Sequence, residues 1–222
     1  MRHHLCLPLY FCLAAYWLRC SSANNVKTPP KPIGVGITLD ARVFYDKTVK
    51  LEETLSESTG KNTNNPAFKK FKEIFAKVHQ EFKTSSVMVN FVVRTAKLND
   101  NLSVPFENMT QAVDGEKTLE NLLEFARTKT VSNNSVFYFF TNRSILKESG
   151  KKHETDQVPV ERFEMNTRGT FCSTNASAAV VSIPNEALGI DFAARATAFV
   201  FGSTRYKSFT RSDRRYMNET FL

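Results

Sequence analysis

The spacing of apolar residues predicts strands at several places along the chain. Residues 33–40 alternate in the manner of a strand, residues 87–93 are almost wholly apolar, and residues 136–140 form a short run of β formers typical of a central strand. Gly34 and Gly36 lie in the first segment without a third glycine or a following helix. A strand with close backbone neighbours is therefore favoured over a phosphate-binding loop.

Two segments have the three- and four-residue spacing of amphipathic helices. Asn65 and Pro66 form a helix start, and an aromatic face follows. Its members are Phe68, Phe71, Phe75, Val78 and Phe82. We expect this face to belong to the core, with a partner-binding groove as the alternative. Leu119, Leu122, Leu123 and Ala126 predict a second, shorter helix.

The remaining pattern predicts one layered domain. Residues 147–157 form a charged loop, and residues 158–163, 170–172 and 178–183 are strand-like. Pro184 and Asn185 open a helix that contains the apolar stretch DFAARATAFVFGS, residues 191–203. Arg195 is the one cation in that stretch, and Asp191 stands one turn before it as a candidate ion-pair partner. The order of elements predicts an α/β fold with no internal repeat.

The N-terminus has the features of a secretory signal peptide. A cationic start, an apolar run and a small-residue exit predict cleavage near Ala23, so that residues 1–23 are the signal and the proline-bearing residues 24–32 are an extended leader. An uncleaved anchor is the alternative, but the apolar run is shorter than the roughly 20 residues that a span needs. We expect a secreted, extracellular protein with no membrane span.

Charge permits acidic partners without identifying one. The formal net charge is +8 over the whole chain, and loss of Arg2 and Arg19 with the signal lowers it to +6. Cations alternate with aromatic residues near the C-terminus, over a tail predicted at 206–222. The candidate polyanion-binding residues are Arg205, Lys207, Arg211, Arg214 and Arg215. Sulfated glycans are the expected polyanion, nucleic acid is not expected, and a solvated segment is the alternative.

No catalytic signature is visible. His79 and His153 have no metal-ligand spacing, and no G-x-S-x-G turn appears. Three cysteines, Cys6, Cys12 and Cys20, lie in the signal, so Cys172 is a lone thiol after cleavage. Six sequons are candidates for N-glycosylation, which suits a secreted glycoprotein. They are Asn101, Asn108, Asn133, Asn142, Asn175 and Asn218.

Four stretches of the chain resemble a known family. They are residues 33–40, 136–145, 168–182 and the helix that ends at Gly202. Their order resembles the catalytic domain of reprolysin or ADAM-type metzincin metalloproteases, specifically the salivary reprolysin-like proteins of hard ticks and, within them, the metastriate 28 kDa salivary family. The resemblance covers about residues 33–205 and implies a metzincin-like α/β fold, with a mixed, mostly parallel sheet, packed helices and a shortened C-terminal subdomain.

The resemblance also implies where a metal site would lie. The family's zinc helix carries H-E-x-x-H-x-x-G-x-x-H. With Gly202 at the motif glycine, Arg195, Phe199 and Arg205 stand at the three ligand positions and Ala196 stands at the glutamate that activates water. None of these side chains can ligate zinc or act as a base.

The expectation is therefore a catalytically inactive metalloprotease homologue without zinc or another cofactor. Its partner would be a host extracellular protein of haemostasis, inflammation or immunity. A residual zinc metalloprotease and a glycan-binding protein that uses the basic tail are the alternatives.

Overall fold

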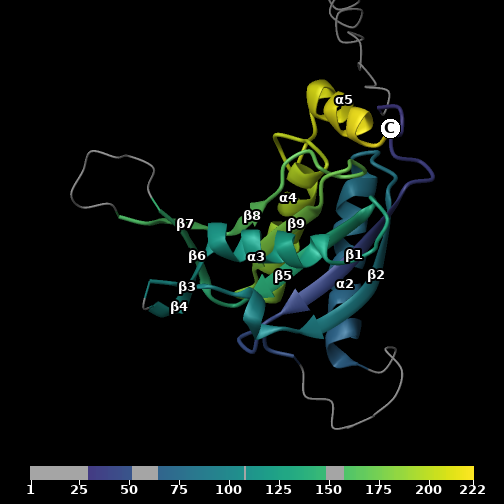
Figure 1. Ribbon diagram of the computed structural model, residues 1–222. Helices are drawn as coiled ribbons and strands as arrows, with labels where there is room; N and C mark the ends of the chain where they lie inside the picture. Colours follow the sequence, from purple (N-terminus) through teal and green to yellow (C-terminus); the bar gives the residue numbers. More distant parts are fainter. Residues whose placement is uncertain (1–29, 52–64, 108, 149–157) are drawn as a thin grey trace, which may run out of the picture. The chain divides into compact units, whose positions relative to one another are not determined.

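The computed structural model describes residues 30–51, 65–107, 109–148 and 158–222, and all of its helices and strands lie in one compact unit, residues 31–222. A five-stranded sheet with the order β2-β1-β5-β9-β8 forms the centre. These strands are β1 (Thr38–Tyr45), β2 (Asn90–Leu98), β5 (Ser135–Thr141), β8 (Glu164–Asn166) and β9 (Ser177–Ser182). Neighbours run parallel except β8, which is antiparallel to β9 at one edge (Figure 1).

A smaller sheet extends from the same side as β8. Its order is β3-β4-β6-β7, with β4 parallel to β6 and the other pairs antiparallel. The strands are β3 (Pro105–Phe106), β4 (Met109–Asp114), β6 (Ser144–Lys147) and β7 (Val160–Arg162). A short 3-10 helix, η2 (Asp100–Leu102), precedes β3. The chain passes from β7 to β8 through Phe163 alone and so changes sheets there.

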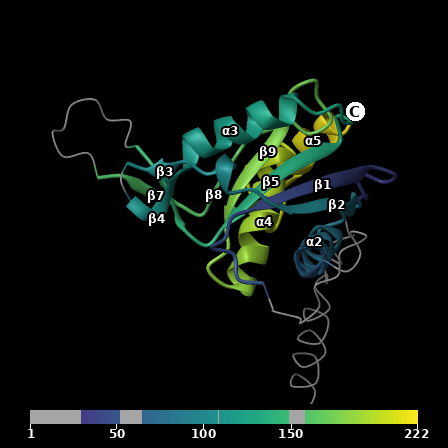
Figure 2. The ribbon, with the colours of Figure 1, turned by 60° about the horizontal axis from the view of Figure 1, so that its bottom comes forward.

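Helices cover both faces of the central sheet (Figure 2). α2 (Pro66–Thr84) and α4 (Glu186–Val200) pack on one face and α3 (Gly115–Arg127) packs on the other. Each face of the sheet has its own hydrophobic core, and β5 contributes to both. Tyr138 and Phe140 belong to the core under α2 and α4, and Phe137 and Phe139 belong to the core under α3. The predicted α/β class and the mixed, mostly parallel sheet with packed helices are confirmed.

The phenylalanine face of α2 is core, as expected. Phe71, Phe75 and Phe82 are 0–1% exposed, and Phe75 meets the Tyr138 ring edge-on at 4.8 Å. The Asn65 side chain accepts a hydrogen bond from the Ala67 N–H, which caps the helix at the predicted start. α4 likewise begins after the predicted cap, Asn185.

Several predicted strand positions were wrong. The first strand begins at Thr38 because Gly34 and Gly36 have φ of +71° and +82°, left-handed conformations that form a turn before the strand. The second strand is β2, which starts at Asn90 and not at residue 87. Residues 170–172 form a turn held by hydroxyl hydrogen bonds between Thr167 and Thr170, and Cys172 has a φ of +58°.

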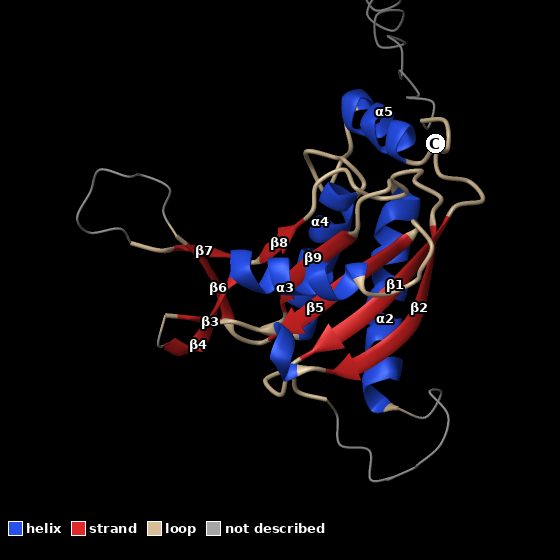
Figure 3. Ribbon diagram, in the orientation of Figure 1, coloured by secondary structure: helices blue, strands red, loops and turns tan. Residues whose placement is uncertain are grey.

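The C-terminal residues belong to the domain and are not a tail. Residues 206–222 include a further helix, α5 (Arg211–Thr220), as Figure 3 shows. Met217 and Phe221 are 0% and 7% exposed and belong to the main core. The predicted boundary after residue 205 is therefore wrong. The missed signal was Thr210-x-x-Asp213, a reciprocal capping box at the helix start.

Asp213 ties α5 to the preceding loop. Its carboxylate is 1% exposed and accepts hydrogen bonds from the backbone N–H of Thr204 and Thr210 at 2.9 Å each, and from both threonine hydroxyls. Burial alone would raise the pKa of Asp213, but these hydrogen bonds lower it far below its ordinary value. The ionised form therefore stabilises the fold.

Replacing Asp213 should expose this dependence. Asp213→Asn is expected to lower the free energy of unfolding by about 1–3 kcal/mol at pH 7, measured by urea denaturation. The reason is that the backbone and hydroxyl donors of Thr204 and Thr210 lose a charged acceptor. The native pKa is depressed, so the difference from wild type should shrink as the pH falls below about 4.

Glu219→Gln is the matched control, because Glu219 is an exposed acid on the same helix. It should change stability by less than about 0.5 kcal/mol. Equal stability of the two variants would contradict the anchoring role of Asp213.

Candidate functional site

α4 positions the residues that the resemblance singled out. The helix lies against β8 and β9 (Figure 1) and ends at Val200. Phe201 is its C-cap, and Gly202 then turns the chain with a φ of +89°. A Cβ at Gly202 would come 3.0 Å from Thr220 Oγ1, so α5 also packs closely at this turn.

The motif positions separate into two environments. Arg195 and Phe199, one turn apart, are half-buried on one face of α4. Ala196 is 0% exposed and lies in the core on the other side of the helix. Arg205 is exposed beyond the helix end. Arg195 and Phe199 thus share one face of α4, as their four-residue spacing requires.

Arg195 pairs with a residue that sequence reasoning missed. Its Nε lies 3.2 Å from Glu164 Oε1 on β8, and the Glu164 side chain is only 7% exposed. Burial raises the pKa of Glu164, while Arg195, Arg162 and Arg168 act in the opposite direction. The contact is an ion pair without hydrogen-bond alignment, since neither Arg195 Nε nor Glu164 Oε2 has a hydrogen-bond partner among the described residues.

The predicted pairing of Arg195 with Asp191 was wrong. The carboxylate of Asp191 instead accepts hydrogen bonds from Lys207 Nζ at 3.0 and 3.1 Å. Lys207 comes from the loop before α5, which no local spacing could have linked to α4.

Aromatic rings surround the Arg195 guanidinium. Its Cζ is 5.6 Å from the centroid of Phe199 and 5.9 Å from that of Tyr206, and the Arg168 guanidinium lies 4.9 Å from the Phe199 ring. These distances are within cation–π range. The space beside the two ligand positions is thus lined by guanidinium groups and rings.

These side chains do not fit a zinc ion. Arginine carries no lone pair available for a metal, phenylalanine has no donor atom, and Ala196 has no carboxylate to activate water. Within the described ranges, no three His, Cys, Asp or Glu side chains are grouped in a way that could hold a metal. His79 stacks on Phe91 at 5.7 Å, and His153 lies outside the described residues.

One face of α4 continues this cluster toward its N-terminus. Leu188, Phe192, Arg195 and Phe199 follow at steps of four, three and four residues and so share one face. Phe192 stacks on Phe163, the residue between β7 and β8, at 4.6 Å with 8° between the rings. Phe163 is 47% exposed and Leu188 is 41% exposed. We give the name α4–β8 surface to the set Leu188, Phe192, Arg195 and Phe199 of α4 together with Arg162, Phe163, Glu164 and Arg168 from β7, β8 and the segments beside them.

The five polyanion candidates do not form one patch. Lys207 is held by Asp191, and Arg214 donates to the backbone carbonyls of Lys31, Ser85 and Ser86. Arg215 lies 3.6 Å from Glu219. Of these five, Arg205 and Arg211 are exposed and have no ion pair to a described residue.

The lone thiol and the described sequon asparagines are on elements other than α4. Cys172 is half-buried beside a pocket of about 500 Å³ between its own loop and α5, forms no disulfide to a described residue, and burial raises its pKa. Exposed sequon asparagines are Asn101, Asn133, Asn175 and Asn218, whereas Asn142 is half-buried. Asn108 and the signal cysteines Cys6, Cys12 and Cys20 lie outside the described residues. Asn133 Nδ2 donates to the Cys172 carbonyl oxygen at 3.0 Å.

Comparison with known proteins gives a distant structural likeness. No family model and no curated sequence matches this chain. Among solved structures it is similar to metalloproteinase-II from Bacteroides fragilis, with 10% identity, a TM-score of 0.42, and coverage of 86% of this chain and 55% of that chain. The chain thus spans about half the length of that protein. Neither metal content nor activity follows from such a likeness.

Removing Arg195 should expose the cost of an unpaired buried carboxylate. Arg195→Met is expected to lower the free energy of unfolding by about 1–3 kcal/mol at pH 7. The double variant Glu164→Gln/Arg195→Met should lose less than the sum of the single variants. Burial raises the pKa of Glu164, so the ionised carboxylate is the form that destabilises the variant. The loss of unfolding free energy in Arg195→Met should therefore diminish as the pH falls toward about 4 and Glu164 takes up a proton.

The matched control is the cycle between Asp191→Asn and Arg195→Met. Since Asp191 pairs with Lys207, these two substitutions should be additive. Additive losses in the Glu164 cycle, measured by urea denaturation, would contradict the assigned ion pair.

Proposed function

We propose that this protein is a secreted, catalytically inactive relative of metzincin metalloproteases that acts by binding other extracellular proteins through the α4–β8 surface. The observation that carries the proposal is that Arg195 and Phe199 stand where the resemblance places two zinc ligands, and that the Arg195 guanidinium is paired with Glu164. A zinc ion beside this guanidinium would meet a positive charge, and among the described residues the Glu164 carboxylate is not joined there by the further His, Cys, Asp or Glu side chains that a zinc site needs.

The composition of the surface supports a role in binding proteins. Phenylalanine, tyrosine and arginine are enriched in protein interfaces because they combine a large contact area with few rotatable bonds or with several hydrogen-bond donors. Phe163 and Leu188 are large apolar side chains left substantially exposed, and Phe192 and Phe199 extend the same strip. Exposed apolar side chains gathered on one face are typical of interaction sites.

The edge strand supports recognition of an extended segment. Phe163 O accepts from Ser182 N and Thr167 N donates to Ala178 O, so alternation along β8 directs the backbone groups of Glu164 and Asn166 away from β9. Glu164 is buried and Asn166 is half-buried, so Asn166 is the more accessible point of this short edge. An extended chain can pair with such an edge and place its side chains on the α4 strip.

The biological setting follows from the sequence resemblance alone. A salivary protein of a blood-feeding tick would meet host proteins of haemostasis, inflammation or immunity. We therefore propose that the bound partner is a host extracellular protein.

Among the described residues, no helix is long and apolar enough to cross a membrane.

Metal and protease assays test the inactive state. Protein purified from a secreting eukaryotic host should contain well under about 0.1 zinc per chain by plasma mass spectrometry, because the donor set is absent. It should cleave neither casein nor fibrinogen above a heat-inactivated sample. Zinc near one per chain with chelator-sensitive cleavage would overturn the proposal in favour of a residual protease.

A plasma capture experiment tests the binding surface. Immobilised wild-type protein should retain specific plasma proteins that Phe163→Asp/Leu188→Asp loses, because aspartate cannot fill an apolar contact. Val35→Asp/Leu98→Asp is the matched control, since Val35 and Leu98 are 71% and 51% exposed on other parts of the chain. Loss of the same proteins by both variants, or by neither, would contradict binding through this surface.

A further inference from the structure

Positive charge at the α4–β8 surface exceeds negative charge. Arg195 pairs with the Glu164 carboxylate at 3.2 Å, Arg168 lies over the Phe199 ring, and Arg162 directly precedes Phe163 in the chain. Arg162 and Arg168 are exposed, and neither forms an ion pair with a residue in the described part of the chain. With Glu164 ionised, the cluster still carries an excess of two positive charges.

Neighbouring charges do not cancel this excess. Lys207 Nζ lies 3.0 Å from Asp191 Oδ1, so these two charges neutralise one another. Glu161, next to Arg162 in β7, accepts a hydrogen bond from the Ser144 hydroxyl at 2.7 Å and so is engaged with β6. Arg168 is held in place by its contact with the Phe199 ring.

Cations and apolar groups alternate along this surface. The stacked rings of Phe163 and Phe192 lie beside the Arg195–Glu164 pair, and Arg168 on Phe199 follows. These contacts join β8 and the turn after it to successive turns of α4. An occupant that satisfies the surface must bring apolar side chains and negative charges in close succession.

We propose that the α4–β8 surface binds an extended acidic segment of a protein, in which Asp or Glu side chains meet Arg162 and Arg168 and an apolar side chain packs on the Phe163–Phe192 stack. This rests on the proposed binding function and names the chemistry of its partner. Arginine favours carboxylates because its planar fork binds both oxygens. A second copy of this chain is a poor occupant, because its own excess of arginines would be repelled.

Selection from a random dodecapeptide library tests the chemistry without assuming a partner. The full secreted protein, immobilised at about 0.15 M salt, should enrich peptides that combine Asp or Glu with Leu, Phe or Tyr. Binding of the leading peptide, measured by fluorescence anisotropy, should weaken as salt is raised, because exposed charges are screened.

Charge reversal locates the site. Arg162→Glu/Arg168→Glu should weaken the leading peptide by at least about tenfold, and replacing the acidic residues of the peptide with Gln or Asn should weaken it by a similar factor. Phe163→Ser should weaken binding but leave its salt dependence unchanged, because it removes only an apolar contact.

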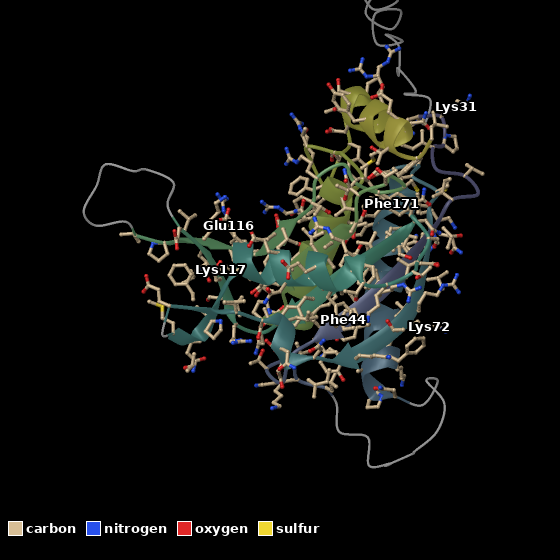
Figure 4. All side chains as sticks on the ribbon, in the orientation of Figure 1. Lys31, Phe44, Lys72, Glu116, Lys117 and Phe171 are labelled. Carbon is tan, nitrogen blue, oxygen red and sulfur yellow. The ribbon has the colours of Figure 1, made fainter. Side chains whose placement is uncertain are left out.

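The matched control is Lys72→Glu/Arg127→Glu, which makes the same change in net charge at exposed cations of α2 and α3. Figure 4 marks Lys72 on α2, which packs on β2 at the sheet edge opposite β8. This variant should bind the leading peptide within about twofold of wild type.

The failures are distinguishable. Enriched peptides that need Phe163 but lack acidic residues would overturn the acidic partner and leave the binding function standing. No enrichment over an empty surface would overturn both. Retention of a heparin dodecasaccharide that depends on Arg162 and Arg168, with no peptide selected, would assign the surface to sulfated glycan instead.

Discussion

A buried carboxylate on an edge strand is the constraint on which this end of the molecule depends. Glu164 on β8 is 8% exposed and lies opposite the apolar Val181 of β9, and Arg195 of α4 is the cation that pairs with it. Arg195 supplies that balance at 3.2 Å and thereby ties the antiparallel edge strand to the helix. The position that the family resemblance assigns to a metal ligand thus serves a structural ion pair.

That pairing has consequences for the surface around it. A guanidinium needs neighbours that tolerate a cation, and the rings of Phe199 and Tyr206 provide them. Phe163 then stacks on Phe192 where the chain leaves the smaller sheet. The result is a face built from rings and arginines, the residue types that are enriched in protein interfaces.

Local signals in the sequence predicted the elements that depend on helix caps and on the spacing of apolar residues. The cap Asn65 and the phenylalanine spacing located α2, and the all-apolar run located β5 as a central strand. β8 escaped prediction because Glu164-Met-Asn166 has no strand pattern of its own and is held by β9 and α4. α5 escaped because the many cations of residues 206–222 favour a basic tail, although Thr210 and Asp213 form a capping box. The candidate site was partly predictable: the shared face of Arg195 and Phe199 follows from helical spacing, whereas the partners Glu164, Arg168 and Lys207 are distant in sequence.

The central claim is that Arg195, paired with Glu164, occupies the place where a zinc ligand would stand. Anomalous diffraction at the zinc edge, from crystals grown with zinc chloride at about twice the protein concentration, tests it directly. The account predicts a guanidinium beside the Glu164 carboxylate and no anomalous peak next to α4. A peak of full occupancy within coordination distance of α4, with Arg195 displaced from Glu164, would contradict it.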